Sequence, residues 1–369
     1  MLIYALLAAY ALATGLVLDW RHGPSVQKIV GLLLLVLLVF FASLRSESVG
    51  RDTYQFCIAF QVALDPSYWP SYTRDLEPGF VLLCKVIGIY TNSSQALIAV
   101  SSIVSLGAVG FFVYRESENM AVSIFAFIAL NLYAFFLNGM RQAIAIGVFL
   151  IFFEISRRSG RKFLVWLGVL FAATFHLSAL VFAIVVIAER GFIGERWWKW
   201  LLGGAVACAV FPGLAVWLLS ITPYGVYVEA SYLNEFIGSN YFGALLQALL
   251  AVYLLILTCR LNDDGGSVIS GSFRASEKEL SNHFLQTMAL LSATLSVASM
   301  GVALFSRVQV YFLFFSVIAI PKIINQSREQ LGGFAVRDVT LILVLSGFWI
   351  VTTLLRPEWY EVVPYNFFF

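Results

Sequence analysis

Arginines, carboxylates and aromatic residues gather in the segment 45–78, between apolar stretches of the chain. It begins with Arg45-Ser-Glu47-Ser-Val-Gly-Arg51-Asp52-Thr-Tyr54 and ends with Arg74-Asp75-Leu-Glu77-Pro78. Carboxylates such as Asp52 and Glu77 can act as general bases towards a sugar hydroxyl. Guanidinium forks match phosphate oxygens, and aromatic faces can stack on sugar rings. The alternative interpretation is a solvated loop with surface ion pairs.

A second candidate is Arg141, in the run Asn138-Gly-Met-Arg141-Gln142 between two apolar stretches. If Asn138 caps the helix that follows, Arg141 lies in the first turn, where the helix dipole favours an anion. A cation there indicates an anion bound by the arginine and the free amides, unless the arginine snorkels to lipid headgroups. Arg307, one turn before Tyr311, raises the same question, and two converging arginines would suit a lipid pyrophosphate.

The third candidate is His176, in Phe175-His176-Leu-Ser178-Ala179, within a long apolar stretch. A titratable side chain at membrane depth is a functional candidate. The alternative is a structural histidine bonded to a carbonyl that a helix break has freed. Glu154 differs, because Arg157 and Arg158 follow it at helical spacing and predict a local ion pair.

Composition shows which elements must hold these residues. The chain has 369 residues, of which 60% are hydrophobic and 12% charged, with a mean hydropathy of +0.88. Soluble domains carry roughly 25% charged residues. We therefore expect an all-α, polytopic transmembrane protein of about 10 to 12 membrane segments, one or two of them broken or re-entrant. A net charge of +2 with scattered basic residues argues against nucleic-acid binding, and the spacing of the Cys and His residues predicts no zinc site.

The distribution of Arg and Lys predicts the topology through the positive-inside rule. Arg157, Arg158, Arg161 and Lys162 make one short loop cytoplasmic. The next loop is also basic, so Phe163–Ala188 must return to the side it left, as a broken hairpin that turns near Thr174–Leu177. Gly79–Tyr90 is too short to cross and is expected to dip in and out. We thus expect a single integral membrane domain over 1–369, a periplasmic loop at 45–78 with functional residues, and a flexible cytoplasmic loop at 259–283.

Several short motifs occur in an order that resembles the EpsG family of bacterial polysaccharide synthesis. They are Arg45…Asp52-Thr-Tyr54, Glu77-Pro78-Gly79-Phe80, Asn138-Gly-Met-Arg141-Gln142-Ala-Ile-Ala145, Phe175-His176-Leu-Ser178-Ala179-Leu180, Arg307…Tyr311-Phe312 and Tyr360…Pro364-Tyr365. The resemblance spans nearly the whole chain. One departure is visible, since Gly50-Arg51-Asp52-Thr53-Tyr54 stands where the family tends to have Gly-Thr-Asp-Tyr.

The resemblance implies a Wzy-type polymerase in the bacterial inner membrane, which joins repeat units carried on undecaprenyl pyrophosphate at the periplasmic face. Donor and acceptor are then both lipid-linked, and a flippase and a chain-length regulator are the implied partners. Another lipid-linked glycosyltransferase, a ligase, or a transporter or flippase remain as alternatives.

The candidate residues fall into three roles. Asp52, Glu77 and His176 compete for the role of base. Arg51, Arg141, Gln142 and Arg307 are candidates for the pyrophosphate, and Arg45, Tyr54 and Tyr311 for the sugars and the rest of the substrate. Because arginines can stabilise a pyrophosphate leaving group by themselves, no metal and no cofactor are required, and a divalent ion bound by carboxylates remains the alternative.

Overall fold

The computed structural model describes residues 2–21, 24–65, 67, 76–189, 197–211, 213, 216–217, 220–221, 241–261, 280–331 and 335–369. Throughout these ranges the regular structure is helical, and extended segments pair only at an isolated bridge between Arg45 and Phe367. The all-α prediction is confirmed. Most of the predicted 259–283 loop, together with Arg74 and Asp75, lies outside the described residues.

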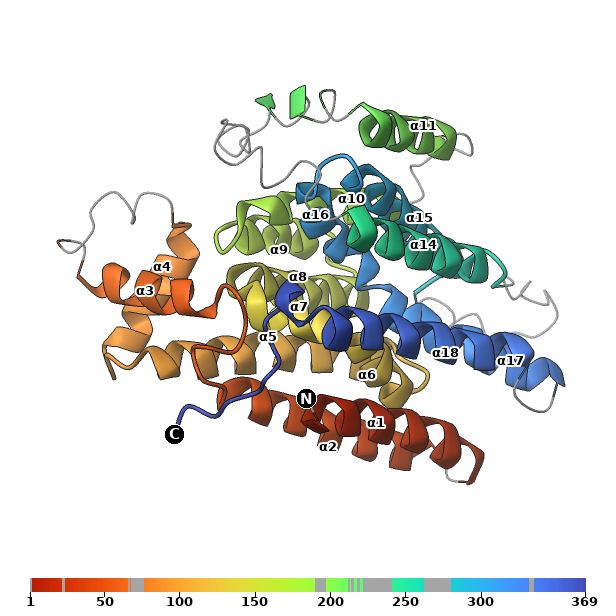
Figure 1. The fold of residues 1–369 in the computed structure, drawn as a ribbon, viewed down its shortest axis with the longest axis horizontal. Helices are drawn as coiled ribbons and strands as arrows, with labels where there is room; N and C mark the ends of the chain where they lie inside the picture. Colours follow the sequence, from red (N-terminus) through yellow and green to blue (C-terminus); the bar gives the residue numbers. More distant parts are fainter. Residues whose placement is uncertain are drawn as a thin grey trace. The chain divides into compact units, whose positions relative to one another are not determined.

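Contacts divide the chain into two compact units, Met1–Ala183 with Ile320–Phe369, and Ile184–Ala319. The first unit contains most of the candidate site residues, and its helices are labelled in Figure 1. Its main helices are α1 (Leu2–Arg21), α2 (Pro24–Ser43), α3 (Thr53–Leu64), α4 (Pro78–Gly88), α5 (Ser94–Glu116), α6 (Met120–Ala129), α7 (Leu132–Asn138), α8 (Met140–Ser159), α9 (Phe163–Ala173) and α18 (Val336–Ile350). Neighbouring helices pack as α1 on α2, α2 on α5, α5 on α8 and α8 on α9.

The segment 45–78 is not irregular throughout, because it contains the helix α3. A helix forms within this expected loop because α3 has an apolar face. Cys57, Phe60 and Ala63 lie on that face and are buried. The following helix, α4, has 11 residues. Eleven residues of α-helix span about 17 Å, well short of the hydrocarbon core, which agrees with the predicted dip.

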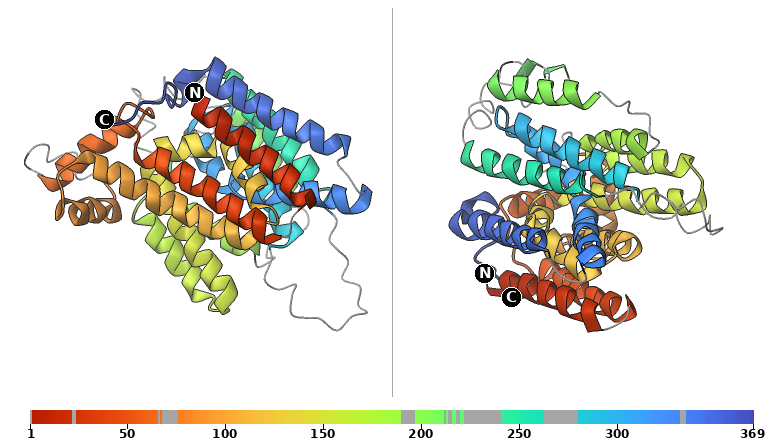
Figure 2. Two further views of the ribbon diagram at one scale, coloured as in Figure 1. Left: turned by 90° about the horizontal axis from the view of Figure 1, so that it is seen from below. Right: turned by 90° about the vertical axis from the view of Figure 1, so that its right-hand side faces the viewer.

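The predicted break near Thr174–Leu177 is confirmed. Helix α9 ends at Ala173, and the chain resumes in a short 3₁₀ turn (η2, Leu177–Val181) and α10 (Phe182–Glu189). Phe171 lies edge-on to Phe152 of α8, with ring centroids 6.1 Å apart, and Phe182 stacks on Phe149 at 3.7 Å. Helix α9 therefore packs along α8, as Figure 2 shows, and the ring of Phe182 at the start of α10 also contacts α8.

A further break, which the hydropathy pattern does not predict, separates α6 from α7 by a bend of 63°. Asn131 stands at the bend in the left-handed region, with φ 58°. Its side chain donates to Thr352 and accepts from Thr353 Oγ1 at 3.0 Å, beyond the end of α18. These hydrogen bonds offset the cost of interrupting a helix in an apolar setting.

The second unit is built around α15 (Asn282–Ser299), which packs against α11 (Trp197–Val210), α14 (Tyr241–Thr258) and α16 (Leu304–Leu313). Its small core cluster comprises Ala205 and Cys208 of α11 with Ala298 and Val302. A bend of 48° follows α16, before α17 (Ser316–Leu331) returns the chain to the first unit.

Within the described residues, four helices are long and apolar enough to cross a membrane, and counting each bent pair as one span makes six. Shorter apolar helices include Thr53–Leu64, Pro78–Gly88, Phe163–Ala173 and Leu177–Glu189. Long spans combined with short and broken ones define a multi-pass α-helical membrane protein.

Candidate functional site

Glu77 connects two side chains that lie far from it in the sequence. Its Oε2 forms an ion pair with Arg141 of α8, and its Oε1 lies 3.0 Å from Nδ1 of His176, at the α9–η2 break. The backbone N–H of Leu177 also donates to Oε1, at 3.3 Å. The exposed fractions of the three side chains are 17% for Glu77, 23% for Arg141 and 21% for His176. The cluster is thus sheltered but still open to a substrate.

Local structure places Glu77 at this point. Pro78 is the first residue of α4, where its fixed φ suits a helix start, and Glu77 is the N-cap. The next amide, Gly79 N–H, donates to the carbonyl of Thr174 at 2.8 Å. The start of α4 is therefore attached directly to the break that carries His176.

Gly79 leaves no room for a side chain at this attachment. A Cβ on Gly79 would lie 2.8 Å from the carbonyl oxygen of Thr174, closer than van der Waals contact allows. We expect Gly79→Ala to lower the stability by about 1–3 kcal/mol, because the backbones must separate. Thermal unfolding of the purified protein in detergent measures this. The matched control is Gly107→Ala on α5, where the added Cβ meets nothing within 4 Å; equal unfolding temperatures for the two variants would contradict the prediction.

Arg141 lies in the first turn of α8, as predicted, although the expected cap is wrong. The N-cap is Gly139, and Asn138 is the last residue of α7. Asn138 instead donates through Nδ2 to the carbonyls of Ala134 and Tyr360, each at 2.9 Å. A cation at a helix N-terminus is unfavourable without an anion, and Glu77 supplies that anion here.

Two aromatic rings, which the sequence did not single out as contacts, border the Arg141 guanidinium. Its Cζ is 5.7 Å from the ring centre of Phe56 on α3 and 6.0 Å from that of Phe80 on α4. These distances fall in the cation–π range. Phe56 is four positions after Asp52, so the two residues share a face of any helix that starts at Asp52. This spacing is the sequence signal that could have predicted Phe56 as part of the site. The buried Nε of Arg141 has no hydrogen-bond partner among the described residues.

The charge on Glu77 determines which ring nitrogen of His176 carries a hydrogen. Burial alone would raise the pKa of Glu77, but the hydrogen bond from His176 and the charge of Arg141 outweigh burial and hold that pKa below its usual 4.5. Glu77 is therefore ionised at neutral pH, and an ionised carboxylate only accepts hydrogen bonds. When the ring is neutral, Nδ1 of His176 must then carry the hydrogen, and the lone pair lies on Nε2.

Of the three candidate bases, the structure brings Glu77 and His176 together. Asp52 lies at the N-terminus of α3, one turn before Phe56, and makes no side-chain capping bond. Arg51 and Tyr54 are exposed at this same end of the first unit, and the Arg51 side chain has no described partner. Gln142, next to Arg141, is buried.

Arg45 has a different environment from the one expected for a sugar ligand. It is 1% exposed and donates to Ser102 Oγ at 2.9 Å and to the carbonyl of Leu137 at 3.1 Å. Its guanidinium joins α2, α5 and α7 inside the first unit, because a buried cation needs hydrogen bonds in place of water. We correct its role to a structural one.

Arg307 and Tyr311 both belong to α16 in the second unit. Arg307 is exposed, whereas Tyr311 is fully buried. A fully buried side chain presents no surface to a sugar, so Tyr311 is also corrected to a buried structural residue. Among the described residues, no group of three or more His, Cys, Asp or Glu side chains could hold a metal ion, and no step below involves one.

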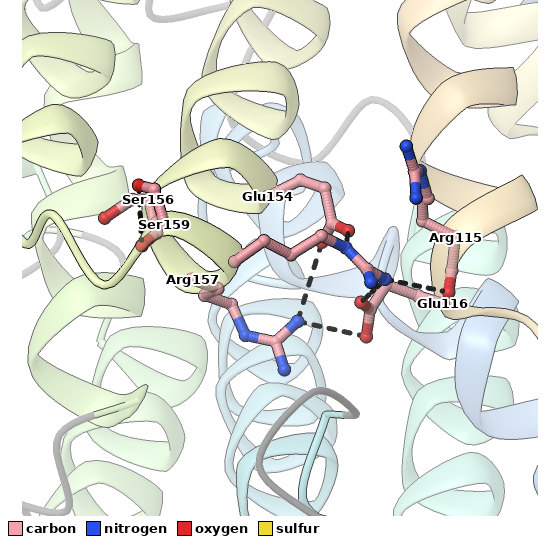
Figure 3. A network of polar contacts seen from close by, with 7 residues as sticks. Arg115, Glu116, Glu154, Ser156, Arg157 and Ser159 are labelled. Atoms are coloured by element: carbon pink, nitrogen blue, oxygen red, sulfur yellow. Dashed lines mark hydrogen bonds and ion pairs between the residues drawn. The ribbon is translucent and has the colours of Figure 1, made fainter. Parts of the chain in front are cut away.

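The opposite end of α8 carries a second charged cluster (Figure 3). Arg157 pairs with Glu116 at 3.0 Å and with Glu154 at 3.7 Å, and Arg158 also contacts both carboxylates. The predicted pairing of Glu154 is confirmed, and Glu116 of α5 is the partner that sequence spacing could not find. Because both carboxylates are buried and paired inside the cluster, we assign it a structural role.

The fold and the site together define the class of this protein. It is a multi-pass helical membrane protein with a partly buried carboxylate–histidine–arginine cluster at one end. The model of the EpsG family matches residues 28–367 of this chain. The chain belongs to the EpsG family, whose members are Wzy-like polysaccharide polymerases. No curated protein and no solved structure matches it.

Proposed function

We propose that this protein polymerises oligosaccharide repeat units carried on undecaprenyl pyrophosphate. The observation that carries the proposal is the position of Glu77, which contacts His176 through one carboxylate oxygen and Arg141 through the other. This arrangement combines a base and an anion-binding group at one site. Glycosyl transfer from a lipid pyrophosphate requires both.

In the proposed reaction, His176 acts as general base. A hydroxyl of the acceptor unit gives its proton to Nε2 of His176 and its oxygen attacks the anomeric carbon of the donor glycan. The bond from that carbon to the pyrophosphate oxygen breaks, and the electron pair leaves with the lipid pyrophosphate. Glu77 orients the ring and stabilises the imidazolium that forms, as the carboxylate does in other carboxylate–histidine pairs.

Arg141 receives the leaving group in this proposal. A pyrophosphate carries more negative charge than Glu77 and can accept both arms of the guanidinium fork. We propose that it takes over the Arg141 contact now made by Glu77, which then acts on His176 alone. Arg51, exposed at the same end, serves as a second cation, while Gln142 is retained as a further candidate and Tyr54 as a sugar contact.

The two ends of α8 support a periplasmic orientation for the site. Arg141 and Arg157 are 16 residues apart, so the two clusters are about 24 Å apart along the helix. The positive-inside rule assigns the end with Arg157, Arg158, Arg161 and Lys162 to the cytoplasm. We propose that the Glu77 cluster faces the periplasm of a bacterial inner membrane, with a flippase supplying repeat units and a separate regulator setting chain length.

A deletion strain tests the proposal directly. The native host without this gene is complemented with wild type, Arg141→Ala or His176→Ala, and its surface glycan is resolved on a gel. We expect the deletion to reduce the ladder to single repeats, wild type to restore it, and neither variant to do so. The matched controls are Arg356→Ala, which removes an exposed arginine paired with Glu358, and His283→Ala, an exposed histidine of the second unit.

Other outcomes would contradict the proposal in different ways. A ladder that persists in the deletion strain excludes polymerisation as the function. One added unit per acceptor would indicate a single-step transferase or ligase. Lipid-linked glycan that stays on the cytoplasmic side would indicate transport.

A further inference from the structure

The C-terminal segment of the chain crosses the end of the first unit that carries the site. The amide of Gly50 donates to the carbonyl of Glu361 at 2.8 Å, and the amide of Arg51 donates to the carbonyl of Tyr360 at 3.2 Å. Further along, Ser46 N–H donates to the Asn366 carbonyl at 2.9 Å. The final residues therefore run along the turn that leads into α3.

One carbonyl in this segment connects two parts of the candidate site. The Tyr360 oxygen accepts from Arg51 N–H and also from Asn138 Nδ2, at 2.9 Å. Asn138 is the last residue of α7, three positions before Arg141, and its side chain is largely buried. The backbone that carries Arg51 and the junction that carries Arg141 are thus held by the same acceptor.

The backbone around this carbonyl adopts conformations that need external support. Glu361 has a φ of +50°, which costs a residue with a side chain free energy, and Gly50 opposite has a φ of +99°. A Cβ on Gly50 would lie 2.7 Å from Thr53 Oγ1, so the turn requires glycine. Strain of this kind persists only where the surrounding contacts determine the backbone, and it occurs most often at functional sites.

We propose that Asn138 is a positioning residue which, through the Tyr360 carbonyl, holds Arg51 and Arg141 at the spacing that lets both cations bind one pyrophosphate. We call Asn138, Gly50–Arg51 and Tyr360–Glu361 the C-terminal clasp. This inference rests on the proposed function. Asn138 and the Tyr360 carbonyl touch no reacting atom, and they act on donor affinity while the Glu77–His176 pair acts on the chemical step.

Donor kinetics of purified protein test the clasp. We expect Asn138→Ala to raise the KM for the lipid-pyrophosphate donor about tenfold, to change kcat less than about threefold, and to leave the pH profile unchanged. The matched control is Tyr365→Phe, which removes the hydrogen bond from Tyr365 Oη to the Phe41 carbonyl in the same segment but outside the clasp. It should keep the wild-type KM.

A double-mutant cycle separates positioning from general destabilisation. If Asn138 acts through Arg51, adding Asn138→Ala to Arg51→Ala raises the KM by much less than tenfold, because the second cation is already gone. Full additivity of the two substitutions, or a wild-type KM in Asn138→Ala, overturns the clasp. If Asn138→Ala does not fold, Glu361→Pro replaces it, since proline cannot adopt the positive φ and must displace the carbonyls; a wild-type KM in that variant likewise overturns the inference.

Binding of inorganic pyrophosphate to the purified protein distinguishes this inference from the proposed function. If wild type neither binds pyrophosphate nor turns over the donor, the proposed function fails and the clasp fails with it. If wild type is active and binds pyrophosphate with the same affinity as Asn138→Ala, the clasp alone is wrong.

Discussion

Replacing Glu77 by glutamine is expected to reduce repeat-unit transfer on the order of 10³-fold while it increases the affinity for pyrophosphate. The glutamine amide cannot stabilise the imidazolium that forms when His176 takes the acceptor proton. It also removes the negative charge that now competes with an incoming anion for Arg141. Opposite changes in catalysis and in anion binding are unusual for a single substitution, because general destabilisation would weaken both.

The experiment measures transfer rate and inorganic pyrophosphate affinity in the same preparation. The matched control is Glu358→Gln, an exposed carboxylate that pairs with Arg356 at 3.5 Å. It should leave both quantities at the wild-type level. Near-normal transfer by Glu77→Gln would show that the mechanism does not need this carboxylate. An unchanged pyrophosphate affinity would show that Glu77 does not compete for Arg141.

The second large effect concerns Arg141→Lys, for which we expect kcat/KM to fall about 10²- to 10³-fold while the protein accumulates normally. Lysine keeps the positive charge but loses the planar fork that can donate hydrogen bonds to two phosphate oxygens. It also loses the flat face that lies beside the rings of Phe56 and Phe80. A positive charge alone at position 141 is therefore not expected to support normal transfer.

Accumulation in the membrane fraction is measured alongside activity, so that loss of protein is not mistaken for loss of function. Arg356→Lys serves as the control, since its side chain is exposed at the same end of the unit. Wild-type activity of Arg141→Lys would rule out the guanidinium geometry as a requirement. Equal losses in the two lysine variants would point to a general effect of arginine replacement.

Part of the site could be predicted from the sequence because the relevant forces act locally. Arg141 was placed in a first helical turn, since the run from Asn138 separates two apolar stretches. The break before Leu177 was predicted from the length of the apolar stretch and the charges around it. Glu154 was paired with Arg158 correctly because residues four apart share a helix face.

Other features depended on distant parts of the chain. The charged segment 45–78 and the family motif make Arg45 a candidate substrate ligand, yet three helices surround it. The bend at Asn131 escaped hydropathy because its stabilising partners are threonines more than 200 positions later. Glu116 was missed as the second partner of Arg157 because it lies on another helix.

The sequence by itself determined the all-α membrane class, the short and broken segments, and the ranges that carry the chemical groups. Those properties follow from hydropathy and charge summed over neighbouring residues, which need no knowledge of packing. Only the tertiary structure decided that Glu77 contacts both His176 and Arg141. These partners lie 99 and 64 residues away. Whether such side chains meet depends on how α4, α8 and the break after α9 pack together. The spacing of residues along the chain does not determine this packing.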